Sequence, residues 1–225
     1  MKTRKTKTPH IQPEAVIKAA LEILDAEGLE NVTLRRLAAK LNVQAPALYW
    51  HFKDKSDITD DMAQAILKNA GLDSITPPED INNWDSWLKD LMSSLRNALT
   101  AHRDGGRVVA GATFGRAYTL EKIVVSTTKV LEKAGFDRLH ASIATSTAID
   151  YVWGFVIEEQ AGMAPQAFLS AVAQSGENPV IQNTSEDDAY LTSIMDEYCK
   201  TTPTKAFDWG LQAIITGLKS AINKE

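Results

Sequence analysis

The sequence has few of the residues that cross-link or interrupt a chain, and it has no long hydrophobic run. Its one cysteine, Cys199, cannot form an internal disulfide and has no cysteine partner for a structural zinc site. Eight prolines and 12 glycines among 225 residues are too few for a low-complexity chain. No apolar run approaches the roughly 18 residues that a membrane-spanning helix needs, and no apolar stretch follows the basic N-terminus as in a signal peptide. Together these absences predict a folded protein in the reducing cytoplasm.

An overall excess of positive charge is also absent, since the formal net charge is −5. The charge is nevertheless unevenly distributed. Residues 1–55 contain ten Lys and Arg against six Asp and Glu, a local charge of +4, which leaves −9 for the remainder. This asymmetry favours contact between the N-terminal part and a polyanion. A flexible, solvated basic arm over residues 1–10 would explain part of the same excess, so charge alone leaves both interpretations open.

The sequence motifs of common enzymes are missing as well. The histidines His10, His51, His102 and His140 are scattered, and no G-x-S-x-G, H-E-x-x-H or P-loop pattern occurs. Cys199 has no base near it in the sequence. An all-helical enzyme is therefore the weaker alternative, and we predict no catalytic residue, no metal site and no cofactor.

Helical periodicity, by contrast, runs through the whole chain. Pro13 suits the first position of a helix that ends before Gly28, and Thr33 suits the N-cap of a second, short helix. A third helix is expected at about 44–52 and a fourth at about 56–71. From Trp84 onward every periodic segment is helical and no strand pattern competes. The sequence therefore predicts an all-α fold.

The spacing of the first helices predicts the domain organisation. Three short helices with a tight turn between the second and third are typical of a helix-turn-helix. We predict a helix-turn-helix domain over residues 11–56 and a larger helical domain over 57–225, joined by the helix at about 56–71. The Pro-containing stretch "SITPPED" (74–80) marks a break after that helix.

Residues 42–55, "NVQAPALYWHFKDK", place three aromatic residues and a histidine almost in succession. On a helix Ala45, Leu48 and Phe52 would share an inward face, which leaves Trp50 and His51 for other faces. The start of the second helix of a helix-turn-helix lies in the DNA major groove, and most hydrogen bonds there go to phosphates. The run is thus compatible with a helix buried on one side and in contact with DNA on the other. The spacing leaves open that the aromatics only fill the core of a small domain.

The stretch "VTLRRLAAKLNVQAPALYWHFKDKSDI" resembles the DNA-binding domain of the tetracycline-repressor (TetR) family, whose signature appears here as "LYWHFKDK". The segments "HRDGGRVV", "STAIDYVWGFVIEEQ" and "FDWGLQAIITGLKSAI" resemble, in the same order, the C-terminal domain of the tetracycline-repressor branch. The resemblance is weak only at about 72–82, 112–120 and 161–189. It implies a dimeric DNA-binding regulator with a C-terminal domain for ligand binding and dimerisation.

The resemblance also implies DNA contacts. Arg35 would contact a base edge, plausibly guanine, through its two-pronged guanidinium. Ala45 stands where the tetracycline-repressor branch has a base-reading Gln, so the operator is expected to differ at that position. Phosphate contacts are implied for Thr33, Tyr49, His51 and Lys55, and a groove lining for Gln44, Pro46, Ala47 and Trp50.

In the C-terminal domain the resemblance is selective. Members of the tetracycline-repressor branch bind a magnesium–drug chelate through an amide, an aromatic and a histidine, where this chain has Leu91, Leu95 and Val109. Glu158 matches an acid of that branch, although a lone exposed carboxylate is the simpler explanation. The match therefore implies an apolar pocket without metal, for a drug-sized hydrophobic or aromatic inducer.

The residues expected to line this pocket are Trp87, Leu91, Leu95, Val109, Phe114, Val124, Thr127, Ile149, Asp150 and Trp153. Most of them are equally compatible with an ordinary core. Thr127, Asp150 and His102 are the polar candidates. Asp150 would cost several kcal/mol if it were buried without partners, and a hydrogen-bonded structural role is favoured for it over ligand contact.

The helices expected at about 138–160 and 204–222 resemble the dimerisation pair of the family, which forms a four-helix bundle from two copies. The resemblance thus implies a homodimer that binds double-stranded operator DNA and acts as a repressor, which a small molecule releases from the operator. A DNA-binding regulator without a small-molecule ligand remains the alternative.

Overall fold

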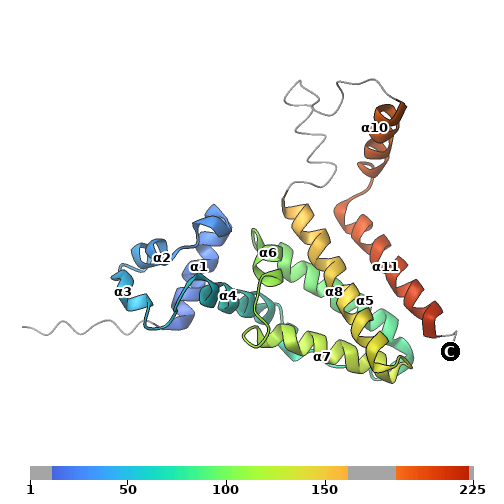
Figure 1. Cartoon of the computed structure of the whole chain (residues 1–225), viewed down its shortest axis with the longest axis horizontal. Helices are drawn as coiled ribbons and strands as arrows, with labels where there is room; N and C mark the ends of the chain where they lie inside the picture. The colour runs from blue at the N-terminus through green and yellow to red at the C-terminus, as the bar shows by residue number, and fades with distance from the viewer. Residues whose placement is uncertain (1–11, 162–185, 223–225) are drawn as a thin grey trace, which may run out of the picture.

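The computed structural model describes residues 12–161 and 186–222, and within these ranges the chain is helical and contains no strand. The prediction of an all-α fold is confirmed. Figure 1 shows α1, α2 and α3 at one end of the long axis and α11 (Pro203–Ile222) at the other. Within the described ranges, no helix combines the length and the apolar character that crossing a membrane requires. The predicted basic arm, residues 1–10, lies outside the described residues.

The head consists of α1 (Pro13–Glu27), η1 (Leu29–Asn31), α2 (Leu34–Lys40) and α3 (Ala45–Leu48). Pro13 opens α1, and Gly28 ends it with φ 87°, a backbone conformation that favours glycine. Both predictions about this helix are confirmed. The core of the head is formed by fully buried side chains of α1, α2 and α3, namely Val16, Ala20, Leu24, Leu37 and Leu48.

Helix α4 (Lys55–Asn69) connects the head to the body. Ile58, Met62 and Ile66 are buried on it, and α4 packs on α1 as well as on α6 (Gly105–Ala110) and α7 (Tyr118–Lys133). Its position agrees with the helix expected at about 56–71. Because α4 belongs to both cores, the predicted boundary at residue 57 falls inside a shared helix.

The body is built from η2 (Leu72–Ser74), η3 (Ile81–Asn83), α5 (Trp84–Thr100), α6, α7, α8 (Arg138–Gln160), α10 (Glu186–Tyr198) and α11. Helix α5 buries one face at helical spacing through Leu88, Leu91, Leu95 and Leu99. Helix α8 packs on α5, α6, α7 and α11. The body therefore has α8 at its centre, as Figure 1 shows.

Helix α11 approaches α8 closely at Gly210. A Cβ atom at this position would lie 2.2 Å from the Tyr151 hydroxyl, which donates a hydrogen bond of 2.9 Å to the Phe207 carbonyl. Burial raises the pKa of Tyr151 to about 12, so the phenol remains a donor near neutral pH. Gly210 thus permits a close approach within the chain, against Tyr151, whereas nothing lies within 4 Å of a Cβ at Gly217.

A matched pair of substitutions on α7 tests the core of the body. Val130 is 1% exposed and Val125 is 49% exposed. Val130→Ala should lower the free energy of unfolding by about 2 kcal/mol, because it removes buried methyl groups and leaves a cavity. Val125→Ala has the same effect on helix propensity and should change stability by less than about 0.5 kcal/mol. Urea unfolding at one fixed protein concentration measures both, and equal losses would contradict the placement of α7.

Candidate DNA interface and interior of the body

The turn between α2 and α3 is closed by the chain itself. The Thr33 hydroxyl accepts the amide N–H of Arg36 at 3.2 Å, which confirms Thr33 as the N-cap of α2. At the other end Asn42 adopts φ 53°, and the amides of Asn42 and Val43 donate to the carbonyls of Ala39 and Ala38. This pair of bonds is a Schellman motif with Asn in the left-handed position. It turns the chain sharply and sets the direction in which α3 leaves α2.

Helix α3 is shorter than predicted. It ends at Leu48 rather than near Phe52, and the amides of His51 and Phe52 then both donate to the Leu48 carbonyl at 3.0 Å. Leu48 and Phe52 are buried, so the turn that follows the helix keeps both side chains in the core of the head. The predicted inward face is therefore confirmed for these two residues.

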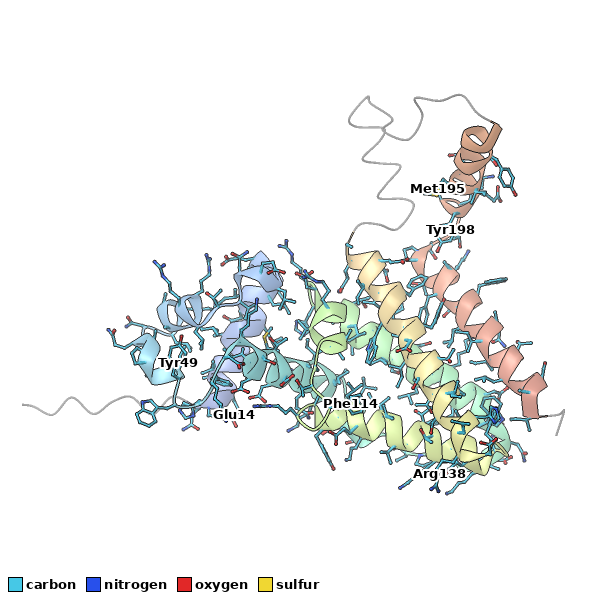
Figure 2. The ribbon with its side chains drawn as sticks, viewed as in Figure 1. Glu14, Tyr49, Phe114, Arg138, Met195 and Tyr198 are labelled. Atoms are coloured by element: carbon cyan, nitrogen blue, oxygen red, sulfur yellow. The ribbon has the colours of Figure 1, made fainter. Side chains whose placement is uncertain are left out.

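The other aromatic residues of the run point outward. Tyr49 is 57% and Trp50 88% exposed, and His51 is exposed beside them. Figure 2 places Tyr49 on the head, far from α11. The alternative in which the aromatics only fill a core is wrong for these three side chains. A solvent-facing indole and phenol directly after the end of α3 are suited to contact with a sugar–phosphate backbone.

The three cations of α2 differ in their partners. Arg36 pairs with Glu27, and Lys40 pairs with Glu22 at 2.8 Å. Hydrogen bonding and charge attraction from Lys40 lower the pKa of the Glu22 carboxyl. Arg35 is exposed and has no ion pair within the described part of the chain. Of the three guanidinium and ammonium groups, that of Arg35 is therefore the one left to contact another molecule.

The remaining predicted DNA contacts differ in how exposed their side chains are. Gln44 and Pro46 are exposed, while Thr33 and Ala47 are half-buried. The half-buried Lys55 directs its ammonium group to the Leu29 carbonyl at 2.9 Å, so it ties α4 to η1. Lys53, exposed on the turn before α4, was not among the predicted contacts. Its place directly after the aromatic run is the signal that would have included it.

In the body, the predicted pocket residues fall into three groups. Leu91, Leu95, Val109, Thr127 and Ile149 are buried, and they come from α5, α6, α7 and α8. Trp87, Val124 and Trp153 are half-buried, and the indole of Trp87 donates to the Thr76 carbonyl at 2.8 Å. The structure thus brings most of the predicted lining into the core between these helices.

The third group departs from the prediction. Phe114 is 61% exposed in the connection between α6 and α7, as Figure 2 shows. Asp150 is exposed because it lies two positions from the buried Val152, on the opposite side of α8. His102 faces α1, where its Nδ1 lies 3.1 Å from the Asp25 carboxylate. These three side chains do not line the interior of the body.

Three polar side-chain atoms in the body are buried without a hydrogen-bond partner among the described residues: the Arg96 Nε, the Thr127 hydroxyl and the Trp153 indole nitrogen. The Arg96 guanidinium nevertheless donates to Glu159 through its Nη2. Next to Thr127, Thr128 behaves in the ordinary way, with its hydroxyl donating to the Val124 carbonyl at 2.9 Å. An unpaired buried polar group costs roughly 1–3 kcal/mol. Thr127 and Trp153 therefore offer hydrogen-bonding capacity that the described residues do not use.

Metal ligands are not clustered in the described residues. No group of three or more His, Cys, Asp or Glu side chains there is arranged to hold a metal ion. Leu91, Leu95 and Val109 are apolar and buried, so none of these three side chains supplies a ligand for a divalent cation. The residues present do not fit the magnesium chelate that the resemblance to the tetracycline-repressor branch brings with it.

Two family models match the chain. The model for bacterial regulatory proteins of the tetR family matches residues 16–62, and the model for the tetracyclin repressor-like C-terminal domain matches residues 76–222. The tetracycline repressor protein class C of Escherichia coli is 39% identical over 209 residues, which cover 93% of this chain and 91% of that protein.

Solved structures agree with these matches. TetR from Acinetobacter baumannii AYE is 30% identical with a TM-score of 0.71, and the match covers 94% of this chain and 98% of that one. BioQ, solved with its natural double-stranded DNA operator, is 30% identical with a TM-score of 0.61, over 74% of this chain and 98% of that one. Because the tetR-family model matches residues 16–62 and the tetracyclin repressor-like model matches residues 76–222, the chain belongs to the TetR family of DNA-binding transcriptional regulators.

Proposed function

We propose that the protein is a dimeric repressor that binds an operator through its two heads and leaves it when a small apolar molecule enters the body. The observation that carries the proposal is the arrangement at α3. Leu48 and Phe52 hold the turn in the core, while Tyr49 and Trp50 face solvent. Arg35 is also exposed, and it has no ion pair among the described residues. Exposing an indole has no benefit for a monomeric fold, and it gives contact area on a DNA backbone.

The proposed DNA contacts follow from these positions. Arg35 would contact a base edge, and Gln44, Pro46, Ala47 and Trp50 would line the groove. Thr33, Tyr49 and His51 would contact phosphates. The Thr33 hydroxyl accepts the Arg36 amide and still has its own O–H to donate. Lys53 is proposed as a phosphate contact in place of Lys55, whose ammonium group is held by Leu29. The solved complex of BioQ with its operator supports this use of the head.

The apolar surface of α8 and α11 supports a dimer. Leu139 and Ile143 are exposed on α8, and Trp209 is 78% exposed on α11. Large apolar side chains on two adjacent helices favour burial against a second copy. A two-fold dimer would present two heads to a palindromic operator.

The proposed ligand site lies in the interior of the body. The side chains proposed to line it are apolar except for the Thr127 hydroxyl and the indole nitrogens of Trp87 and Trp153. Among the described residues the Thr127 hydroxyl and the Trp153 indole have no partner, whereas the Trp87 indole donates to the Thr76 carbonyl. Because an indole nitrogen only donates, a ligand that uses it must carry a hydrogen-bond acceptor. A variant of the A. baumannii TetR, 31% identical, has been solved in complex with minocycline, which supports a small-molecule ligand for this chain. The alternative is a regulator without a ligand. A screen that finds a binding compound would exclude it, and a screen that finds none would support it.

The first prediction concerns sequence preference. On a duplex selected from a random pool, Arg35→Ala should relax the preference at one base pair, with a loss of about 1–3 kcal/mol against the correct base. Arg138→Ala is the matched control, because Figure 2 places Arg138 at the far end of the body. Binding titrations against single-base variants of the selected duplex measure the effect. An unchanged preference in Arg35→Ala would remove Arg35 from the base contacts.

A second prediction separates a ligand site from an ordinary core. Thr127→Val should raise the free energy of unfolding of the ligand-free protein by about 1 kcal/mol, because the hydroxyl that it removes has no partner among the described residues. Thr145→Val is the control. Thr145 is equally buried, but its hydroxyl lies 3.1 Å from that of Thr128, so this variant should lose about 1 kcal/mol.

The same variant tests the ligand. Compounds that raise the melting temperature of the unaltered protein in a screen of hydrophobic molecules should lose much of that effect in Thr127→Val. A loss of stability in Thr127→Val equal to that in Thr145→Val, with no compound affected, would favour the regulator without ligand.

A third prediction concerns metal. Since Leu91, Leu95 and Val109 supply no ligand to magnesium, tetracycline binding measured by isothermal titration should not depend on magnesium. Tetracycline is titrated with magnesium and with a chelator in separate experiments. Sub-micromolar binding that requires magnesium would show that the interior differs from the arrangement described above.

A further inference from the structure

One face of α4 carries polar side chains that hold the connection between α6 and α7. Asp60 and Gln64 lie one turn apart on this face. The Asp60 Oδ1 accepts the Thr113 amide at 2.8 Å. The Gln64 Oε1 accepts the Thr119 amide and its Nε2 donates to the Thr119 hydroxyl, each at 2.8 Å. Thr119 lies in the first turn of α7, where an amide has no partner within its own helix. Helix α4 therefore caps α7 from outside.

Arg116, from the same connection, pairs with two carboxylates of α4. Its guanidinium contacts Asp57 Oδ1, and its Nε lies 3.4 Å from Asp60 Oδ2. Asp57 and Asp60 are buried. The pKa of the neighbouring Asp61 carboxyl is raised, first by burial, although Arg116 opposes the shift. Two buried carboxylates on adjacent turns repel each other and lose hydration, so the position of α4 depends on the charge of Arg116.

The second oxygen of Asp57 points toward the head. Asp57 Oδ2 accepts the Lys53 amide at 2.7 Å, and the Asp57 amide donates to Asp54 Oδ1 at 3.1 Å. Lys53 directly follows the segment of Tyr49 to Phe52. A single carboxylate thus bonds the end of that segment with one oxygen and Arg116 with the other.

The contacts that link Lys53, Asp57 and Arg116 extend through the connection between α6 and α7 to the interior of the body. The connection follows α6, and the Ala112 amide donates to the carbonyl of the buried Val109 at 3.2 Å. Within the few residues from Ala112 to Arg116, the chain passes from the proposed ligand site to the pair of carboxylates on α4.

We propose that Arg116 is a positioning residue for operator binding. It contacts no DNA and acts through Asp57 and Asp60, which hold α4 and the turn at Lys53 in the orientation that presents α3. Without Arg116, two buried carboxylates lose their counter-charge and α4 must shift to hydrate them. In a dimer such a shift changes the separation of the two heads, on which simultaneous contact with both half-sites depends. The inference rests on the proposed operator binding.

The test compares Arg116→Gln with Arg138→Gln, a distant arginine paired with Glu132. The probe is the duplex selected from the random pool, titrated at several salt concentrations. Arg116→Gln should lose roughly tenfold in affinity, the size of a typical coupling between sites. Its salt slope should stay unchanged, because Arg116 neutralises no phosphate. Arg138→Gln should bind like the unaltered protein.

Two further variants distinguish positioning from a general loss of stability. Arg116→Lys keeps the charge and should recover part of the affinity. Adding Asp57→Asn and Asp60→Asn to Arg116→Gln removes both buried charges and keeps a carbonyl oxygen for the Lys53 and Thr113 amides, so this triple variant should also recover affinity. These two variants apply the test even if Arg116→Gln does not fold.

The contrary outcomes differ from one another. A salt slope that falls by about one unit in Arg116→Gln would make Arg116 a phosphate contact, and an unchanged affinity would make the pairing irrelevant to DNA binding. Failure of both compensating variants to recover affinity would also overturn the inference. Absence of any duplex binding by the unaltered protein would instead refute the proposed function.

Discussion

The arrangement of the molecule depends on the double burial of α4. Ile58, Met62 and Ile66 on this helix are inaccessible to solvent or nearly so, because one side of α4 packs on α1 and the other on α6 and α7. A helix buried on two sides cannot rotate without opening one of the two cores, since protein interiors are close-packed. The position of the head relative to the body is therefore fixed by contacts in the two cores that share α4.

Helix α8 plays the corresponding part in the body. It buries small side chains such as Ala141, Ala144 and Ala148, which let neighbouring helices approach closely, and it exposes Leu139 and Ile143. Its apolar character is therefore spread around the helix rather than confined to one stripe, which is typical of a helix with packing partners on several sides. The chain supplies partners through α5, α7 and α11, and the exposed side chains remain for a second copy.

Much of the fold was predictable from the sequence because its signals are local. Pro13, Gly28 and Thr33 act within their own helices, and the periodic leucines of α5 define its buried face. The errors arose where a distant partner decides. Lys55 is held by Leu29, and His102 lies against Asp25, 77 positions away in the sequence. Helix α3 is shorter than expected because Phe52 must reach the core. Asp57 and Asp60 lie at helical spacing in the sequence, but their partner Arg116 lies in a connection without periodicity, so the sequence did not reveal the pairing.

The two polar features of the body respond differently to a bound molecule. The Thr127 hydroxyl and the Trp153 indole are unpaired among the described residues, so a ligand that satisfies them gains free energy without breaking a protein hydrogen bond. The carboxylates of Asp57 and Asp60 are already paired with Arg116, so any movement of the connection after α6 weakens existing contacts. A ligand that shifts α6 would thus gain hydrogen bonds with Thr127 and Trp153. The same shift would weaken the contacts of Arg116 with Asp57 and Asp60. A ligand changes DNA affinity only if it binds the shifted arrangement and the DNA-binding arrangement with different affinities, because a ligand that binds both equally does not change their populations.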